Sequence, residues 1–401
     1  MALLILLAAV SLVALAIAVD ALSPAPARVD PKSMSDARRF EPASADAALV
    51  TLPADTSRLR REAAITSMAG QPQATGTAVA RARELILRAR QDGDPRWLGM
   101  AEAALAHWRA DPAPPTDVLL LRATLLQGRH DFQGALRDLT ALLGREPAHA
   151  QAWLTRATIE RVLGHYPQAV RSCTRLWSLR RDLLADACLA DARQLAGSDS
   201  AYRYLQSRAA ALLETAGDES SAWVLTVLAE MAERTGEPDA AERYYRRSLT
   251  LAPDLYTRVA LADLLLDSGR PLQAWQALES APPSDAVLLR RARATREAAL
   301  SDAPALRQHV QERLASNRER GDTSHHREHA WFALHLADNP AQAVALAERN
   351  WQSQREPADA LLLAKAARAS GREDLLAALR HTVQSGGPHD ARLARLLEPS
   401  R

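Results

Sequence analysis

The sequence has few aromatic residues. Only 4% of its 401 residues are Phe, Trp or Tyr, although 47% are hydrophobic, so its core must consist mainly of alanine and leucine. Alanine allows helices to approach closely and has the highest helix propensity, whereas strands favour β-branched and aromatic residues. This composition predicts an all-α protein.

The sequence also lacks a charge excess, and it has almost no lysine. It contains 50 basic and 48 acidic residues, and Lys32 and Lys365 are its only lysines. A nucleic-acid-binding protein usually carries a basic face, so the near balance argues against a nucleic-acid partner. The scarcity of lysine leaves few candidates for amine chemistry.

Several motifs of common enzymes are absent from the sequence. It has no G-x-x-x-x-G-K phosphate loop, no G-x-S-x-G nucleophile elbow and no glycine-rich dinucleotide motif after a strand. We therefore expect no enzymatic activity, no cofactor and no small-molecule substrate.

The sequence has only two cysteines, Cys173 and Cys188, which we expect on neighbouring helices. They could form a disulfide in an exported protein and would stay reduced in the cytosol. Because a free cysteine packs like a small hydrophobic residue, we expect two buried thiols. Their spacing does not resemble a zinc-binding Cys-x-x-Cys pair.

The N-terminal region begins with an uncharged apolar run, Ala2 to Val19. Its length lies between that of a signal-peptide core and the ~20 residues that span a bilayer. We predict that residues 1–21 are a signal peptide or a membrane anchor and that residues 22–75 are a flexible Pro/Ala/Ser-rich linker. We favour a protein that is anchored in the inner membrane or is periplasmic or exported; the basic residues after the run leave a cytoplasm-facing anchor open.

The stretch from Asp117 to Arg181 contains the same pattern twice, 34 residues apart. The pattern places a large apolar residue first, a small residue four positions later, and then an aromatic residue after a turn. The matched pairs are Leu119 and Trp153, Ala123 and Ala157, Phe132 and Tyr166, Ala135 and Ala169, and Leu139 and Cys173. The pattern returns between Ala222 and Ala281, and weaker copies extend it over residues 76–397.

On these residues the chain resembles tetratricopeptide repeat (TPR) proteins of a bacterial, membrane-associated or exported kind. Each helical hairpin has an apolar face that it cannot bury alone, so neighbouring hairpins must stack. We therefore predict a right-handed superhelical solenoid of about eight or nine hairpins with an open concave groove.

The resemblance implies that the first helix of each hairpin lines the groove, where a partner protein or peptide would bind. The function expected is a non-catalytic scaffold for protein interactions at the bacterial cell envelope. The groove residues that the resemblance implies are Thr124, Gln127, Leu154, Thr158, Arg161, Trp223, Thr226, Glu230, Asp263 and Leu266.

Two alternatives stay open. His325, Glu328 and His329 fit the H-x-x-E-H pattern of a metal-dependent hydrolase, although we expect the polar first turn of a helix there. The chain could also be an assembly factor for a membrane complex that uses its convex face or the basic stripe Arg290, Arg293 and Arg296. We expect this stripe to be a solvated helix face.

Overall fold

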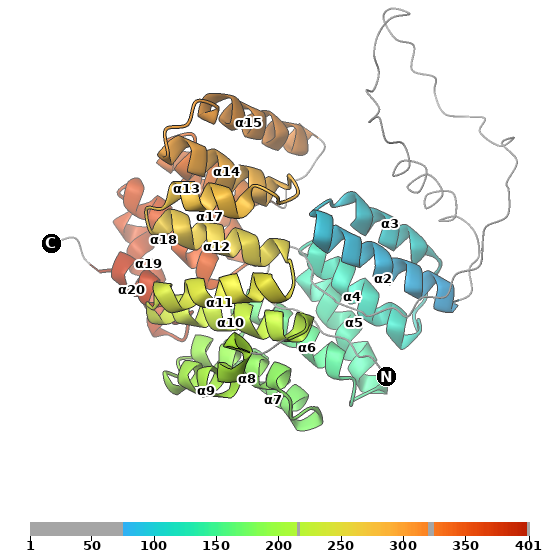
Figure 1. The fold of residues 1–401 in the computed structure, drawn as a ribbon. Coiled ribbons are helices and arrows are strands. Elements are labelled where there is room, and N and C mark those ends of the chain that lie inside the picture. The colour runs from blue at the N-terminus through green and yellow to red at the C-terminus, as the bar shows by residue number, and fades with distance from the viewer. Residues whose placement is uncertain (1–74, 215–216, 320–324, 399–401) are drawn as a thin grey trace, which may run out of the picture.

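The computed structural model describes residues 75–214, 217–319 and 325–398 (Figure 1). These ranges contain the helices α2 to α20 and no strand, which confirms the predicted all-α class. None of the helices in these ranges is both long and apolar enough to cross a membrane. The predicted signal or anchor segment and all but the last residue of the predicted linker lie outside the described residues.

The helices form nine consecutive hairpins in the described ranges, and a short helix, α20 (Ala391–Leu396), follows them (Figure 1). The first helices are α2 (Thr75–Asp92), α4 (Thr116–Gly128), α6 (Ala150–Val162), α8 (Leu183–Leu195), α10 (Glu219–Thr235), α12 (Leu255–Asp267), α14 (Asp285–Glu297), α16 (His326–His335) and α18 (Pro357–Ala369). The second helices are α3 (Arg96–Ala104), α5 (Phe132–Arg145), α7 (Tyr166–Leu179), α9 (Ser200–Ala209), α11 (Pro238–Leu251), α13 (Pro271–Leu278), α15 (Ala303–Glu319), α17 (Pro340–Ser353) and α19 (Glu373–Gln384).

The turn inside each hairpin contains one residue with a positive φ angle. Gly236, for example, ends α10 in the left-handed conformation at φ 83°, where a side chain would be strained. The equivalent positions are Gly93, His130, Gly164, Gly197, Gly269, Ala299, Asp338 and Gly371. A positive φ angle therefore recurs in the turns of all nine hairpins, including the three turns where the residue is not glycine.

Small residues lie where the helices pack most closely. Ala123 and Ala157 occupy the predicted small positions, Ala229 and Ala262 are the equivalent residues of two later hairpins, and none of the four is more than 3% exposed. A larger side chain at such a position would overpack the core by ~1–3 kcal/mol. The sequence pattern thus reports the packing between the helices of each hairpin.

The superhelix closes on itself, which corrects the prediction of an open concave groove. The N–H of Arg355, just before α18, donates to the carbonyl oxygen of Val162 at the end of α6 (2.7 Å). The hydroxyl of Tyr166 donates to the carbonyl oxygen of Arg355 (2.7 Å). This approach requires Gly164 in the turn between α6 and α7, because a Cβ atom there would lie 3.0 Å from that of Arg355.

Further contacts join early and late hairpins. Arg90 of α2 pairs with Asp254 before α12 (2.8 Å), and Arg392 of α20 pairs with Glu233 of α10. His130 Nδ1, in the turn between α4 and α5, is 3.2 Å from the side-chain nitrogen of Gln354. A period of 34 residues predicts how neighbours stack, but such contacts depend on the accumulated curvature of the whole array.

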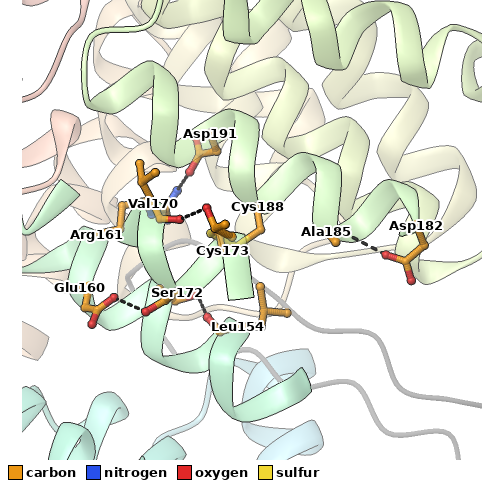
Figure 2. The surroundings of a disulfide bond; sticks show 12 residues. Leu154, Glu160, Arg161, Val170, Ser172, Cys173, Asp182, Ala185, Cys188 and Asp191 are labelled. Carbon is orange, nitrogen blue, oxygen red and sulfur yellow. Dashed lines mark hydrogen bonds and ion pairs between the residues drawn. A yellow bond between two sulfur atoms is a disulfide. The ribbon is translucent and has the colours of Figure 1, made fainter. Parts of the chain in front are cut away.

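Cys173 of α7 and Cys188 of α8 form a disulfide, and their Cα atoms are 5.5 Å apart (Figure 2). The expectation of two free buried thiols is therefore wrong. The two cysteines lie on adjacent helices of successive hairpins, so packing brings both side chains to bonding distance. The disulfide covalently links the third hairpin to the fourth.

Candidate functional site

The helices enclose a central cavity of about 660 Å³. Most of its lining comes from the first helices of the hairpins, including α6, α10, α12, α14, α16 and α18. The exposed residues Gln91, Glu219 and Asp267 also border it, so the cavity is open to solvent. Closure of the superhelix therefore replaces the predicted open groove by this cavity.

Five of the ten predicted groove residues line the cavity: Arg161, Trp223, Thr226, Glu230 and Asp263. Five do not: Thr124, Gln127, Leu154, Thr158 and Leu266. The hydroxyls of Thr124 and Thr158 donate to carbonyl oxygens in their own helices, and both residues are buried by helix packing, as are Leu154 and Leu266.

A group of buried charges lies beside the cavity, and we call it the inner charge cluster. It brings together residues of α6, α8, α10, α16 and α18, and its members are Arg161, Asp191, Glu230, Arg234, Arg327, Glu356 and Asp359. Charges removed from water in this way require close partners of opposite sign.

Arg161 is the centre of the cluster and is only 5% exposed. Its guanidinium donates to Asp191 at 2.9 Å, as Figure 2 shows, and lies 3.6 Å from Glu230 and 3.5 Å from Glu356. Burial opposes the charge of Arg161, but these three carboxylates outweigh it and raise its pKa above the usual value. Arg234 of α10 also pairs with Asp191.

Arg327 forms the second half of the cluster. It lies 3.0 Å from Glu356 and 2.6 Å from Asp359, and the side-chain amide of Asn350 also donates to Asp359 (2.6 Å). Glu356 therefore connects Arg327 with Arg161, which links α16 to α6 across the closing contact.

Two carboxyl groups of the cluster are harder to ionise than usual. Burial, assisted by the charge of Asp191, raises the pKa of Glu230 to about 7 although Arg161 and Arg234 oppose the shift. The hydroxyl of Tyr256 donates to Glu230. Burial also raises the pKa of Asp359 to about 6, against the attraction of Arg327.

Two buried N–H groups of cavity-lining residues have no hydrogen-bond partner among the residues that the structure describes. They are Nε1 of Trp223 and Nε of Arg161, and their residues are 7% and 5% exposed. A buried donor that has lost water without gaining an acceptor costs about 1–3 kcal/mol. Both residues belong to the lining of the cavity, and an acceptor oxygen that reached either N–H group would relieve this cost.

Of the predicted metal-binding residues, His325 lies at the closing contact, Glu328 lines the central cavity, and His329 lines a separate cavity beside α15 and α17. The rings of His325 and His130 are 5.9 Å apart. Burial opposes ionisation of Glu328, but the positive charges of His325 and Arg327 bring its pKa below the usual range. Within the described residues no three histidine, cysteine or carboxylate side chains come together as a metal site, so the hydrolase alternative has no ligand set there.

Arg290 and Arg293 of the basic stripe on α14 are not on the solvated face that the sequence predicts, whereas Arg296 is exposed. Arg290 pairs with Asp263 (2.8 Å) and Arg293 with Asp267 (3.1 Å), and both arginines line the central cavity. Arg296 pairs with Asp338 of the next hairpin (2.8 Å). The stripe is used for ion pairs between hairpins.

Sequence analysis missed several members of the site: Asp191, Arg234, Tyr256, Arg327, Glu356 and Asp359. One available signal was α8, because a helix of mainly alanine and leucine contains the polar residues Asp186, Asp191 and Gln194, all of which are buried. Buried polar residues need partners, so they indicate a polar cluster inside the array.

No model of a known protein family matches the sequence, and no curated protein matches it. The chain is similar to a tetratricopeptide repeat protein from Parabacteroides merdae, with 18% identity over 72% of this chain and 99% of that chain (TM-score 0.36). It is also similar to the human IFIT1 dimer with PPP-AAAA, with 13% identity over 82% of this chain and 87% of that chain (TM-score 0.43). A third similar structure is the APC/C hetero-tetramer Cut9-Hcn1, with 16% identity over 77% of this chain and 59% of that chain (TM-score 0.41). The assignment of TPR-like hairpins rests on the helix pairing and turn geometry described above.

The raised pKa of Glu230 predicts a pH-dependent stability. Its pKa of about 7 in the folded chain exceeds the ordinary value of 4.5, so its contribution is full below pH 4.5 and is lost as the pH rises through 7. Glu230→Gln should reduce the fall in thermal unfolding midpoint between pH 5 and pH 7.5. Some of the fall should remain, because the pKa of Asp359 is raised in the same sense.

The control for this experiment is Glu84→Gln, which alters a half-exposed glutamate of α2. It should keep the pH dependence of the unaltered protein. An identical pH dependence in Glu230→Gln and Glu84→Gln would contradict the assignment.

Proposed function

We propose that the chain is a protein-interaction scaffold that holds a segment of a partner protein in its central cavity. The observation that carries this proposal is a pair of N–H groups, on Trp223 and Arg161, that have no partner in the described part of the chain and belong to residues lining a solvent-accessible cavity. The carbonyl oxygens of a peptide backbone are acceptors of the kind these donors require.

The rest of the lining fits such a segment. Leu255, Val259, Leu361 and Leu362 provide apolar surface, while Arg290 and Arg293 of the lining are already held by carboxylates. Peptide-binding grooves commonly combine main-chain hydrogen bonds, which supply affinity, with apolar contacts to side chains, which supply specificity.

The partner can be found from the rim of the cavity. A photo-crosslinking amino acid at Glu219, which is exposed and lines the cavity, should capture the partner in intact cells. The same group at Arg243, an exposed residue of α11 outside the cavity, is the control and should not capture that protein.

Trp223→Phe should then weaken binding of the purified partner. The substitution keeps an aromatic side chain but removes the five-membered ring with its N–H, and for the lost hydrogen bond we expect about 0.5–1.5 kcal/mol, which is roughly 2- to 13-fold in Kd. Isothermal titration calorimetry measures the change. Trp275→Phe, outside the cavity, is the matched control and should bind normally. Equal affinities of the two variants would contradict the proposal.

We also propose that the scaffold works on the oxidising side of the cell envelope. The apolar run within residues 1–21 supports this location, and so does the disulfide between Cys173 and Cys188, because disulfides persist mainly in oxidising compartments.

Thiol alkylation in rapidly quenched cells tests the location. A maleimide reagent of high mass should modify neither cysteine until the protein is reduced, whereas deletion of residues 2–21 should leave both thiols open to modification. Two reactive thiols in the full-length chain would contradict the proposed location.

A further inference from the structure

The packing of the array is interrupted at α15. At every other junction between successive hairpins in the described ranges, the second helix packs against the first helix of the next hairpin. Helix α15 packs against α14 but not closely against α16 or α17, and it stands at the edge of the molecule in Figure 1. Only Val310 and Leu314 of its 17 residues are buried.

The interruption leaves a cavity of about 880 Å³ between α15, α16 and α17, which we call the α15 seam. Leu314, Phe332 and Leu346 provide its apolar surface. Among the described residues that form it there is no carboxylate, and the ionisable residues of its lining are Arg307, Arg318, His326, His329 and Arg349. None of the residues of the α15 seam lines the central cavity.

The three arginines of the α15 seam differ from Arg290 and Arg293 of the central cavity. Arg318 and Arg349 are exposed and form no ion pair with a described residue, and Arg307 reaches only the carbonyl oxygen of Leu336, at 3.5 Å. By contrast, Arg290 and Arg293 are held by carboxylates. Within the described residues, the three arginines of the α15 seam therefore have no carboxylate partner and lie around an apolar surface.

We propose that the α15 seam is a second docking site and that it binds an acidic amphipathic helix of a protein partner. Such a helix would occupy the place where another helix would normally pack, with apolar residues against Leu314, Phe332 and Leu346. Its carboxylates would pair with Arg318 and Arg349, which gives the charge complementarity that selects an acidic partner. This site is separate from the central cavity, so it does not depend on the proposed function.

The test uses a fluorescent peptide as long as α15, with leucine at positions i, i+3, i+4 and i+7 and glutamate on the other face. It should bind the full chain and should bind the double variant Arg318→Glu/Arg349→Glu at least about tenfold more weakly, which corresponds to about 1.4 kcal/mol. Fluorescence anisotropy measures the affinities, and a peptide with lysine in place of glutamate should not bind.

The matched control is Arg203→Glu/Arg243→Glu, which reverses two exposed arginines of α9 and α11 and changes the net charge equally. It should bind the acidic peptide as the unaltered chain does, and so should Trp223→Phe. Circular dichroism should show that both double variants are folded.

Three outcomes would overturn the proposal. The first is no binding of the acidic peptide, and the second is an equal loss of binding in the two double variants. The third is binding of phosphatidylglycerol vesicles, but not of the peptide, that is lost with Arg318→Glu/Arg349→Glu; this result would make the α15 seam a lipid site.

Discussion

The structure depends on the compensation of one buried charge, the guanidinium of Arg161. Its partners come from three other helical segments: Asp191 from α8, Glu230 from α10 and Glu356 from the start of α18. Removing one partner from a buried ion pair typically costs about 3–5 kcal/mol, so this group favours the arrangement in which all four segments meet. The closed superhelix is the arrangement that provides it, since Glu356 lies beside the main-chain bond between Arg355 and Val162.

Closure also determines what the molecule can offer to a partner. An open solenoid would present a long concave surface, whereas this chain keeps a bounded cavity with solvent access at Gln91 and Glu219. The disulfide joins the hairpin of Arg161 to the hairpin of Asp191, so it restrains α8 of the inner charge cluster and α7, the helix paired with α6 (Figure 2). The arrangement of the helices around the cavity is thus stabilised by a disulfide and by ion pairs between segments distant in the sequence.

The repeating hairpins could be predicted from the sequence because their signals are local. Ala123 and Ala157 mark helix contacts within one repeat, and Gly164 marks the turn that follows. The closing contacts could not be predicted, because Tyr166 and Arg355 are 189 residues apart and meet only through the summed curvature of the array. The candidate site could be predicted only in part for the same reason. Family resemblance places residues on the first helices, but closure decides that Glu230 lines the cavity while Thr158 is covered by packing.

The central claim is that the superhelix is closed in solution, and the distance between its early and late hairpins tests it most directly. Spin labels at Arg129, in the turn after α4, and at Ser353, at the end of α17, would lie on either side of the contact between His130 and Gln354. Double electron–electron resonance on the disulfide-bonded chain should give one short, narrow distance distribution. A long or broad distribution would show an open array and would contradict the account.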